Sequence, residues 1–268
     1  MNEQGIMVTE NMVAIPEKRV MKFFEEFEGI KYYERAVMLM NTVISNGERL
    51  KNFFDDCKKE TVPFDLSKLD ELLNFANKLT FDYCSSIGIF EDLLRKSLSK
   101  DTIALGKFDI GRHNIYSTQK EYRFWVKFRN FVVHYNIPIE NLIYKKGEGL
   151  SFISSKDYLL RFDGWGCVKR DINEMNSDPI DVELMIEPMK YDVYWLYIHY
   201  LFCAGQYINR AAEAIHSLLH EYPLNHPVFL CYNEEPNIAK KIVPTIKTIK
   251  IDTVNKALED LKKHPNAR

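Results

Sequence analysis

The chain of 268 residues is 46% hydrophobic, enough to bury a substantial core, which excludes disorder as the default. Lysine and arginine number 36 and aspartate and glutamate 38, so no chain-wide positive field attracts the protein to a polyanion, and any contact with nucleic acid must be local. The five cysteines are scattered, without the CxxC pair of a zinc ribbon or a redox couple, and are predicted to be buried thiols in a reducing cytosol: Cys57, Cys84, Cys167, Cys203 and Cys231.

No segment has the character of a leader or of a membrane span. The N-terminal MNEQGIMVTENMVAIPEKRV carries acidic residues and lacks an apolar stretch after a basic start. The longest apolar run, VYWLYIHYLFCA at 193–204, falls short of the roughly 20 residues that cross a bilayer, and it contains His199. A soluble, cytoplasmic protein without a membrane partner is therefore expected.

The first third of the chain is predicted to be helical. Apolar residues recur every three or four positions over residues 17–59, which indicates one long helix or two helices joined near Gly29. The same period returns over residues 66–98, where SSIG at 85–88 is a candidate break.

The motif-bearing helix is predicted to follow a loop. KFDIGRHNIYST at 107–118 has no clear period and contains Gly111, so it is interpreted as a loop leading into a helix capped by Ser117 or Thr118. Pro138 is expected to end that helix, because proline has no N–H with which to continue it.

The character of the chain changes after this helix. Between about 148 and 187, LSFISS, DYLLRF and CVKRDI are predicted as short strands, with DGWG as a tight hairpin turn between the last two. Helical spacing returns over residues 188–220, and residues 252–263 are predicted to form an amphipathic helix.

The predicted fold class is therefore mostly α. We expect an antiparallel helical bundle over residues 1–147, a small β-hairpin insertion over 148–187 and a C-terminal helical part over 188–268.

The stretch RFWVKFRNFVVHYNIP at 123–138 combines aromatic and branched apolar residues with a few polar ones. On an ideal helix that turns about 100° per residue, four polar residues spaced by four, three and four form a single stripe: Arg123, Lys127, Asn130 and His134. The remaining surface is almost wholly apolar, so the helix is predicted to be buried nearly all round. A polar stripe of this kind is, for amphipathic helices at large, most often a solvated strip.

Arg129 does not belong to this stripe. It lies about 140° from His134, between Trp125 and Val133, in a sector that should be apolar. A buried guanidinium needs a partner, because an unpaired charge in the interior costs several kcal/mol. Either Arg129 reaches the cleft that His134 faces, one shared with a second copy of the chain, or an acidic residue of a neighbouring helix pairs with it. The candidates for that pairing are Glu25, Glu26, Glu28 and Glu34.

RNFVVHY has a histidine five positions after an arginine, an asparagine directly after the arginine and an aromatic residue after the histidine. This pattern resembles the R-x4-H motif of the HEPN superfamily (higher eukaryotes and prokaryotes nucleotide-binding), in which the motif lies late in an antiparallel helical bundle. The resemblance covers about residues 17–145 and does not extend to the β insertion or the C-terminal third. It implies metal-independent RNA cleavage, found in many members, or binding of a nucleotide or a protein without cleavage, found in others.

The resemblance also implies roles for the motif residues. Arg129 would hold the scissile phosphate, and Asn130 would orient the phosphate or the imidazole. His134 would act as acid or base on the ribose 2′-hydroxyl or the leaving 5′-oxygen, which suits an imidazole because it exchanges protons near neutral pH. Substrate contacts are predicted for three further residues of this segment: Arg123, Lys127 and Tyr135.

The expected function is therefore a HEPN-type endoribonuclease that leaves 2′,3′-cyclic phosphate ends and needs no metal or other cofactor. It would act on RNA as a homodimer in a bacterial toxin or phage-defence setting, with a cognate antitoxin or a nucleotidyltransferase as a candidate partner. The rival hypothesis is a non-catalytic HEPN-like module that binds a nucleotide or a protein. The nearly balanced charge favours the rival, because RNA affinity comes largely from phosphate contacts.

Three further features are interpreted as structural. His216 and His220, four apart on a predicted helix, could share a metal, but no HExxH pattern is present and they are assigned to the helix surface. The aromatic run YDVYWLYIHYLF at 191–202 could stack bases, yet its helical spacing favours packing. The lysines of KKIVPTIKTIKID at 240–252 are assigned to a solvated edge.

Overall fold

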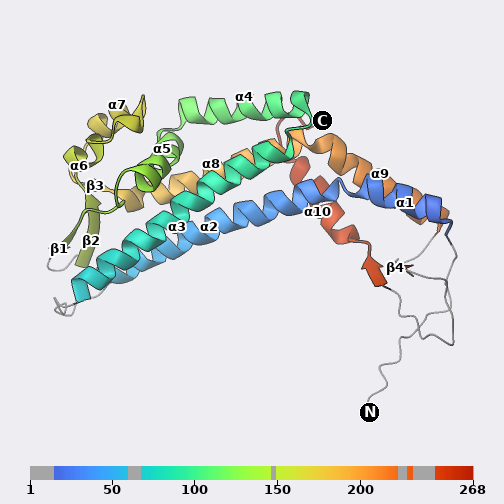
Figure 1. Ribbon diagram of the computed structural model, residues 1–268, viewed down its shortest axis with the longest axis horizontal. Coiled ribbons are helices and arrows are strands. Elements are labelled where there is room, and N and C mark those ends of the chain that lie inside the picture. The colour runs from blue at the N-terminus through green and yellow to red at the C-terminus, as the bar shows by residue number, and fades with distance from the viewer. Residues whose placement is uncertain (1–14, 60–67, 146–148, 223–227, 232–244, 268) are drawn as a thin grey trace, which may run out of the picture. The chain divides into compact units, whose positions relative to one another are not determined.

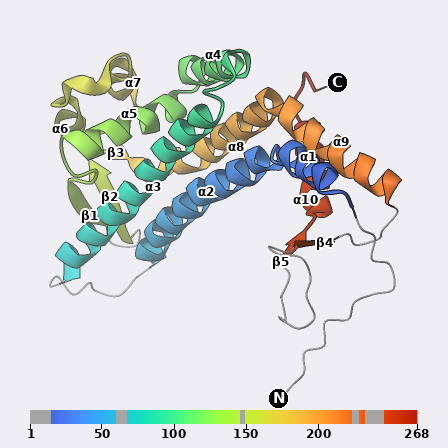
Figure 2. The same ribbon diagram turned by 45° about the vertical axis from the view of Figure 1, so that its right-hand side comes forward.

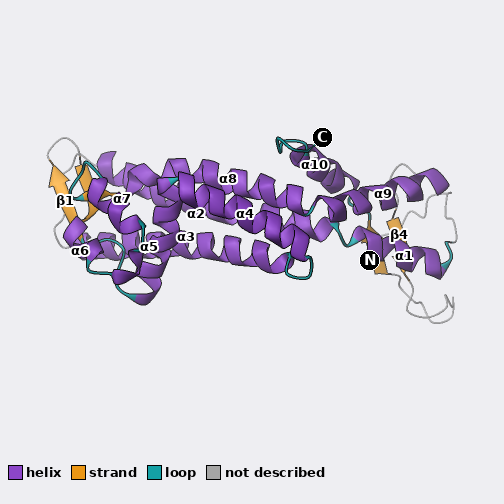
Figure 3. Cartoon of the chain, turned by 90° about the horizontal axis from the view of Figure 1, so that it is seen from above, coloured by secondary structure: helices purple, strands orange, loops and turns teal. Residues whose placement is uncertain are grey.

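The computed structural model describes residues 15–59, 68–145, 149–222, 228–231 and 245–267. Helices dominate these residues, as the sequence predicts, and two small antiparallel sheets accompany them (Figure 1; Figure 3). The contacts within the chain define a larger compact unit, Glu34–Ala204, and a smaller one that combines the chain up to Tyr33 with Gly205–Asn266. These two units differ from the three segments expected from the sequence, because residues 1–147 and residues 188–268 each contribute to both.

The core of the larger unit is an antiparallel bundle of α2 (Ile30–Lys59), α3 (Leu69–Ser97), α5 (Lys120–His134) and α8 (Ile186–Cys203) (Figure 2). The side chain of Asn46 in α2 donates to the Asp82 carbonyl in α3, and Phe53 packs edge-on against Phe75, so these two helices run in opposite directions. α3 continues without a break through the SSIG stretch.

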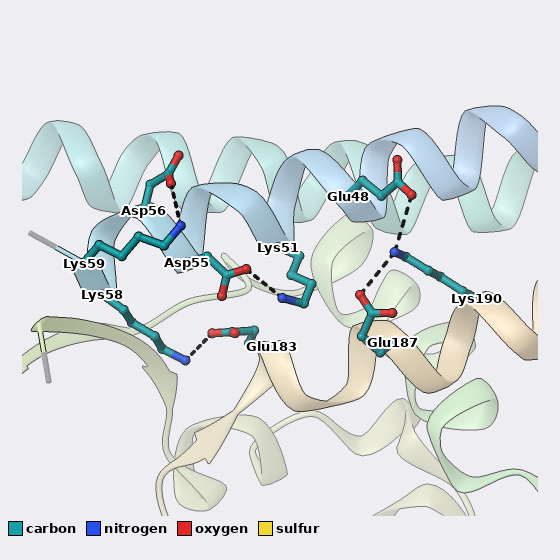
Figure 4. A network of polar contacts seen from close by, with 9 residues as sticks. All are labelled: Glu48, Lys51, Asp55, Asp56, Lys58, Lys59, Glu183, Glu187 and Lys190. Carbon is teal, nitrogen blue, oxygen red and sulfur yellow. Dashed lines mark hydrogen bonds and ion pairs between the residues drawn. The ribbon is translucent and has the colours of Figure 1, made fainter.

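A group of ion pairs joins α2 to η3 (Val182–Met185) and to α8 (Figure 4). Lys190 lies 3.5 Å from Glu48 and 3.1 Å from Glu187, and Lys58 lies 2.5 Å from Glu183. Each pair is partly exposed, so each contributes at most about 1 kcal/mol and mainly helps to set how the helices align.

Helix α4 (Thr102–Thr118) occupies the segment that the sequence predicted as a loop, so that prediction was wrong. The Asp101 carboxylate caps it by accepting hydrogen bonds from two backbone N–H groups. A Cβ at Gly111 would lie 2.2 Å from Nε2 of His199, so this glycine permits close packing on α8 instead of breaking the helix. The cap predicted for α5 was also wrong, because Gln119 precedes that helix without a side-chain cap.

The small antiparallel β region is confirmed, but two of its three strands lie elsewhere than predicted, one of them before residue 148. β1 (Asn141–Lys145), β2 (Gly149–Ser154) and β3 (Ile180–Asp181) form a sheet in that order, with Ile153 opposite both Asn141 and Asp181. Strand β2 confirms the strand predicted at LSFISS.

The two remaining predicted strands were wrong, because α6 (Lys156–Leu160), η2 (Asp163–Trp165) and α7 (Val168–Glu174) occupy that stretch. The Ser155 hydroxyl caps α6 by accepting from the Tyr158 N–H. The buried apolar residues of the segment do not alternate as they would in a half-buried strand: Tyr158, Leu159, Trp165, Val168 and Ile172. The hairpin expected at DGWG is instead a short helical turn that ends at Gly166, whose φ is 57°.

An aromatic column joins α5 to this helical segment. Trp165 is fully buried and stacks on three phenylalanines of α5, with ring centroids 5.8 to 6.3 Å apart: Phe124, Phe128 and Phe131. Burying each such ring contributes roughly 2 kcal/mol, so the column firmly anchors the motif-bearing helix.

The smaller unit contains α1 (Glu17–Phe27), α9 (Gly205–Glu221), β4 (Val228–Cys231), β5 (Thr245–Thr248) and α10 (Ile251–Leu261). The helix break predicted near Gly29 is confirmed, since α1 ends before this glycine and α2 begins after it. A Cβ at Gly29 would lie 2.0 Å from the Tyr207 carbonyl oxygen of α9. The predicted C-terminal helix is confirmed as α10.

The cysteines depart from the prediction at one position. Cys57, Cys84 and Cys203 are buried, whereas Cys167 is exposed, with its sulfur 3.7 Å from the Tyr116 hydroxyl. The prediction of a buried thiol was therefore wrong for Cys167. The side chain of Cys231 lies outside the described part of the chain.

Candidate functional site

Helix α5 buries one broad face and leaves its polar stripe at the edge of the bundle. Its fully covered residues are Tyr122, Phe124, Trp125, Phe128 and Phe131. Along the stripe, Arg123, Lys127 and Asn130 are partly buried and His134 is exposed. Val133 is 42% exposed, so the expectation that the helix would be buried nearly all round was too strong.

Arg129 lies on the side of α5 that faces α3. A Cβ at Gly88 would come within 2.9 Å of Nε of Arg129, so the absence of a side chain at Gly88 makes room for the guanidinium. Burial raises the pKa of the nearby Cys84 thiol, and the Arg129 charge opposes that rise. Arg129 is thus a cation held between two packed helices.

The acidic partner considered for Arg129 is not found. Its Nη1 donates a 3.3 Å hydrogen bond to Oδ1 of the adjacent Asn130, and within the described ranges no carboxylate lies within ion-pair distance. Asn130 therefore orients the guanidinium, and most of the donors of Arg129 have no acceptor among the described residues.

His134 occupies the last turn of α5, where its side chain is exposed. Its position on the helix is about 140° from that of Arg129. Among the described residues no hydrogen bond connects the two side chains. The fold thus presents both motif residues at the edge of one helix without joining them within one chain.

The chain that follows His134 is held firmly. Ile139 donates to Oδ1 of Asn77 (2.8 Å) and accepts from Nδ2 of the same side chain (3.2 Å). The Tyr158 hydroxyl donates to the Ile137 carbonyl, and the Ser154 hydroxyl donates to the Pro138 carbonyl. These bonds give the region beside His134 a defined backbone conformation.

Of the three predicted substrate contacts, Arg123 already has a partner. Its Nε and Nη2 donate to the two carboxylate oxygens of Asp171 on α7, at 2.5 and 2.9 Å. Both side chains are largely covered, with 15% and 7% exposure. Lys127 is partly buried and forms no ion pair within the described residues. Tyr135 is 47% exposed and directly follows His134.

A separate buried cluster joins α3, α4 and α5. The Tyr122 hydroxyl donates to Oε1 of Glu91 at 2.5 Å, and Nη1 of Arg112 lies 3.6 Å from Oε2. Burial raises the pKa of Glu91, while the hydrogen bond from Tyr122 and the charge of Arg112 oppose the rise. These contacts tie α3, α4 and α5 together, although the buried Nε of Arg112 has no hydrogen-bond partner among the described residues, so the cluster acts as a structural bridge.

The two histidines, the aromatic run and the lysines that were interpreted as structural from the sequence fit that interpretation in the described part of the chain. His216 and His220 are exposed on α9. The run at 191–202 supplies much of the α8 core, although Tyr191, Tyr194 and Trp195 are at least 40% exposed. Lys247 lies over the Phe24 ring, 4.8 Å from its centroid, whereas residues 240–244 lie outside the described part of the chain.

Fold and site together define a mostly α-helical protein with an arginine and a histidine five positions apart on a helix of its bundle: Arg129 and His134. No protein-family model, curated protein or solved structure matches the chain. Over the residues that the structure describes, no helix is long and apolar enough to cross a membrane, and no group of three or more His, Cys, Asp or Glu side chains could hold a metal ion.

Sequence reasoning missed the residues that position this site. Gly88 was interpreted as a helix break, although a glycine within an otherwise regular helical period also signals close packing. Asn77, Ser154 and Tyr158 come from three separate elements, and no local pattern connects them with the end of α5.

Proposed function

We propose that this protein is a metal-independent endoribonuclease of HEPN type, with Arg129, Asn130 and His134 as its reactive group. One observation carries the proposal: Arg129 has no carboxylate partner within the described residues, yet it is held in place by Gly88 and Asn130. A guanidinium whose donors are not used by an internal carboxylate is available for a phosphate.

The chemistry requires only these side chains and the substrate. The ribose 2′-hydroxyl attacks the adjacent phosphorus, and His134 removes its proton or supplies one to the leaving 5′-oxygen. Arg129 binds the scissile phosphate and stabilises charge developing on its oxygens. Because the attack is intramolecular, positioning and proton transfer supply much of the acceleration.

A homodimer would bring Arg129 and His134 of two chains into one site. The surface of α3 carries four large apolar residues that are 37 to 51% exposed: Phe75, Phe81, Ile89 and Leu93. Val133 and Ile137, near His134, are also exposed. These exposed apolar residues on α3 and near the end of α5 support association of two copies.

A non-catalytic binding module is the second candidate. It is favoured by the separation of Arg129 and His134 on the helix and by the use of Arg123 in an internal ion pair. A toxin or phage-defence setting, and an antitoxin or nucleotidyltransferase partner, rest on the family resemblance alone.

The experiment incubates the purified protein with total RNA in excess chelator. We expect cleavage products with 2′,3′-cyclic phosphate and 5′-hydroxyl ends, and no cleavage by Arg129→Ala or His134→Ala. His216→Ala is the matched control, because this histidine is exposed on α9. RNA with a 2′-deoxy sugar at the cut site should stay whole.

Full cleavage by His134→Ala, or activity that disappears with the chelator, would contradict this mechanism. Binding of a nucleotide or an oligonucleotide without cleavage would support the second candidate.

A further inference from the structure

The aromatic column reaches the protein surface beside His134. Tyr135 is 47% exposed, and its ring centroid lies 5.4 Å from that of Phe131 and 5.5 Å from that of Phe162. Phe162 in turn packs edge-on against the buried Trp165, with centroids 5.8 Å apart. An exposed ring is thus held against the buried Phe131 and the partly buried Phe162 on one side and is open to solvent on the other.

The Phe162 side of this surface is shaped by Gly164. A Cβ at Gly164 would lie 2.1 Å from the Phe162 ring, so the ring lies directly over the backbone of the short helix η2. The bonds from Tyr158 and Asn77 hold the backbone that follows Tyr135. Little conformational freedom is left to lose when a flat ligand stacks here.

The charges near these rings are mixed. Arg161, next to Phe162, is exposed and forms no ion pair within the described ranges. Asp163, on the other side of Phe162, is exposed as well and weakens the attraction of Arg161 for a phosphate. Stacking is therefore expected to contribute more than charge to any ligand affinity at this surface.

We propose that Tyr135 and Phe162 form a stacking subsite for one nucleobase of a single-stranded RNA, adjacent to His134, with Arg161 contacting the neighbouring phosphate. This inference rests on the proposed function and adds to it the form of the substrate. A duplex keeps its bases stacked on one another, so only an unpaired base can use the face of Tyr135. The subsite accepts any base, because every base has an aromatic face.

The test measures binding apart from cleavage. A fluorescent single-stranded oligonucleotide with 2′-deoxy sugars throughout serves as the probe, since it has no 2′-hydroxyl to attack phosphorus. A second probe has the same length and backbone but no bases. Fluorescence anisotropy titration measures the affinity of the wild-type protein for each probe. We expect the probe without bases to bind about tenfold more weakly than the probe with bases.

Substitutions then test whether Tyr135 and Phe162 cause the difference in affinity between the two probes. Tyr135→Leu should lose about tenfold in affinity for the probe with bases and should no longer distinguish the two probes. Tyr135→Phe retains a ring and should bind as the wild type does. Phe162→Leu should lose affinity in the same direction. Tyr191→Leu is the control, because Tyr191 is a 77% exposed tyrosine on α8. Circular dichroism establishes that each variant is folded.

Each outcome bears on the subsite or on the proposed function. If the wild type cleaves RNA through His134 while Tyr135→Leu keeps its affinity and KM, the subsite is refuted and the proposed function stands. If the wild type binds the probes as expected and cleaves no RNA, the subsite stands and the proposed function fails. A wild type that binds neither probe, or a Tyr135→Leu variant altered only in its oligomeric state by light scattering, would overturn the subsite.

Discussion

The guanidinium of Arg129 in α5 lies over Gly88 in α3, so close that a Cβ at Gly88 would come within 2.9 Å of Nε and 3.3 Å of Cζ. The absence of a side chain at Gly88 thereby makes room for the guanidinium that α5 places against α3. Helix packing and the position of the motif arginine consequently depend on the same contact.

Gly88→Ala should separate stability from activity. Alanine raises helix propensity by up to about 1 kcal/mol, which offsets the cost of the crowding, so the free energy of unfolding should change by less than about 1 kcal/mol. RNA cleavage should fall at least tenfold, because the new methyl group displaces the guanidinium. Thermal unfolding and initial cleavage rates measure the two effects.

The matched control is Gly106→Ala, since a Cβ at this exposed glycine of α4 meets no atom within 4 Å. It should stabilise the protein and leave cleavage unchanged. Equal activity of Gly88→Ala and the wild type would remove Arg129 from the proposed site.

The protein should be a dimer at micromolar concentration. Ile89→Glu places a charge in the exposed apolar surface of α3 and should convert the dimer to a monomer, as measured by light scattering. Leu184→Glu, at a 71% exposed position of η3, should leave the dimer intact. A monomeric wild type would contradict a shared active site.

Replacement of Arg123 should chiefly lower the stability of the fold and not the affinity for RNA. Arg123→Met leaves the Asp171 carboxylate, with its side chain only 7% exposed, without its bidentate partner and should lower the free energy of unfolding by about 3 kcal/mol. Arg123→Met combined with Asp171→Leu should recover most of this loss, because the pair is then replaced by apolar groups. Urea unfolding measures both.

Arg170→Met is the control, since Arg170 is 79% exposed and lies 3.7 Å from Glu174. It should change stability by less than about 0.5 kcal/mol. If Arg123→Met were as stable as the wild type but bound RNA weakly, Arg123 would be a substrate contact, as the sequence predicted.

Asp192 should make the protein less stable as the pH rises. Burial, followed by the nearby Glu121 carboxylate, raises the pKa of Asp192 from 3.8 to about 6. Between these values the folded protein holds a proton that the unfolded chain releases, so this contribution to the free energy of unfolding falls as pH rises through that window. Above about pH 6 the full cost of the buried charge is present.

Asp192→Asn should therefore stabilise the protein by about 1 kcal/mol at neutral pH, a value reduced for the partial exposure of the carboxyl group, and by much less near pH 4. Urea unfolding at the two pH values measures the difference, with the exposed Asp163→Asn as control. If Asp192→Asn stabilised the protein more at the lower pH than at neutral pH, the pH dependence would be opposite to that expected for a buried carboxyl group, and the prediction would be wrong.

The sequence by itself determined the helical class and most of the bundle. The threes-and-fours spacing predicted the helical segments that hold α1, α2, α3, α8, α9 and α10, because the period of the buried face shows in the chain, although it did not predict the division between α8 and α9. It also identified Arg129 as a cation in an apolar sector, since the angle between residues of one helix follows from their spacing.

Only the tertiary structure decided what the glycines pack against, where the short helices form and what the arginines contact. Gly88 and Gly111 resemble breaks in the sequence, but their small size is required by Arg129 and His199, which belong to other helices. The helices at 156–174 fold around Trp165, whose stacking partners lie about forty residues away in α5. Asp171 pairs with Arg123 across a similar separation, and local spacing carries no information about such contacts. They arise when the helices pack, which is why the partner of Arg123, and the absence of one for Arg129 among the described residues, could not be predicted from the chain alone.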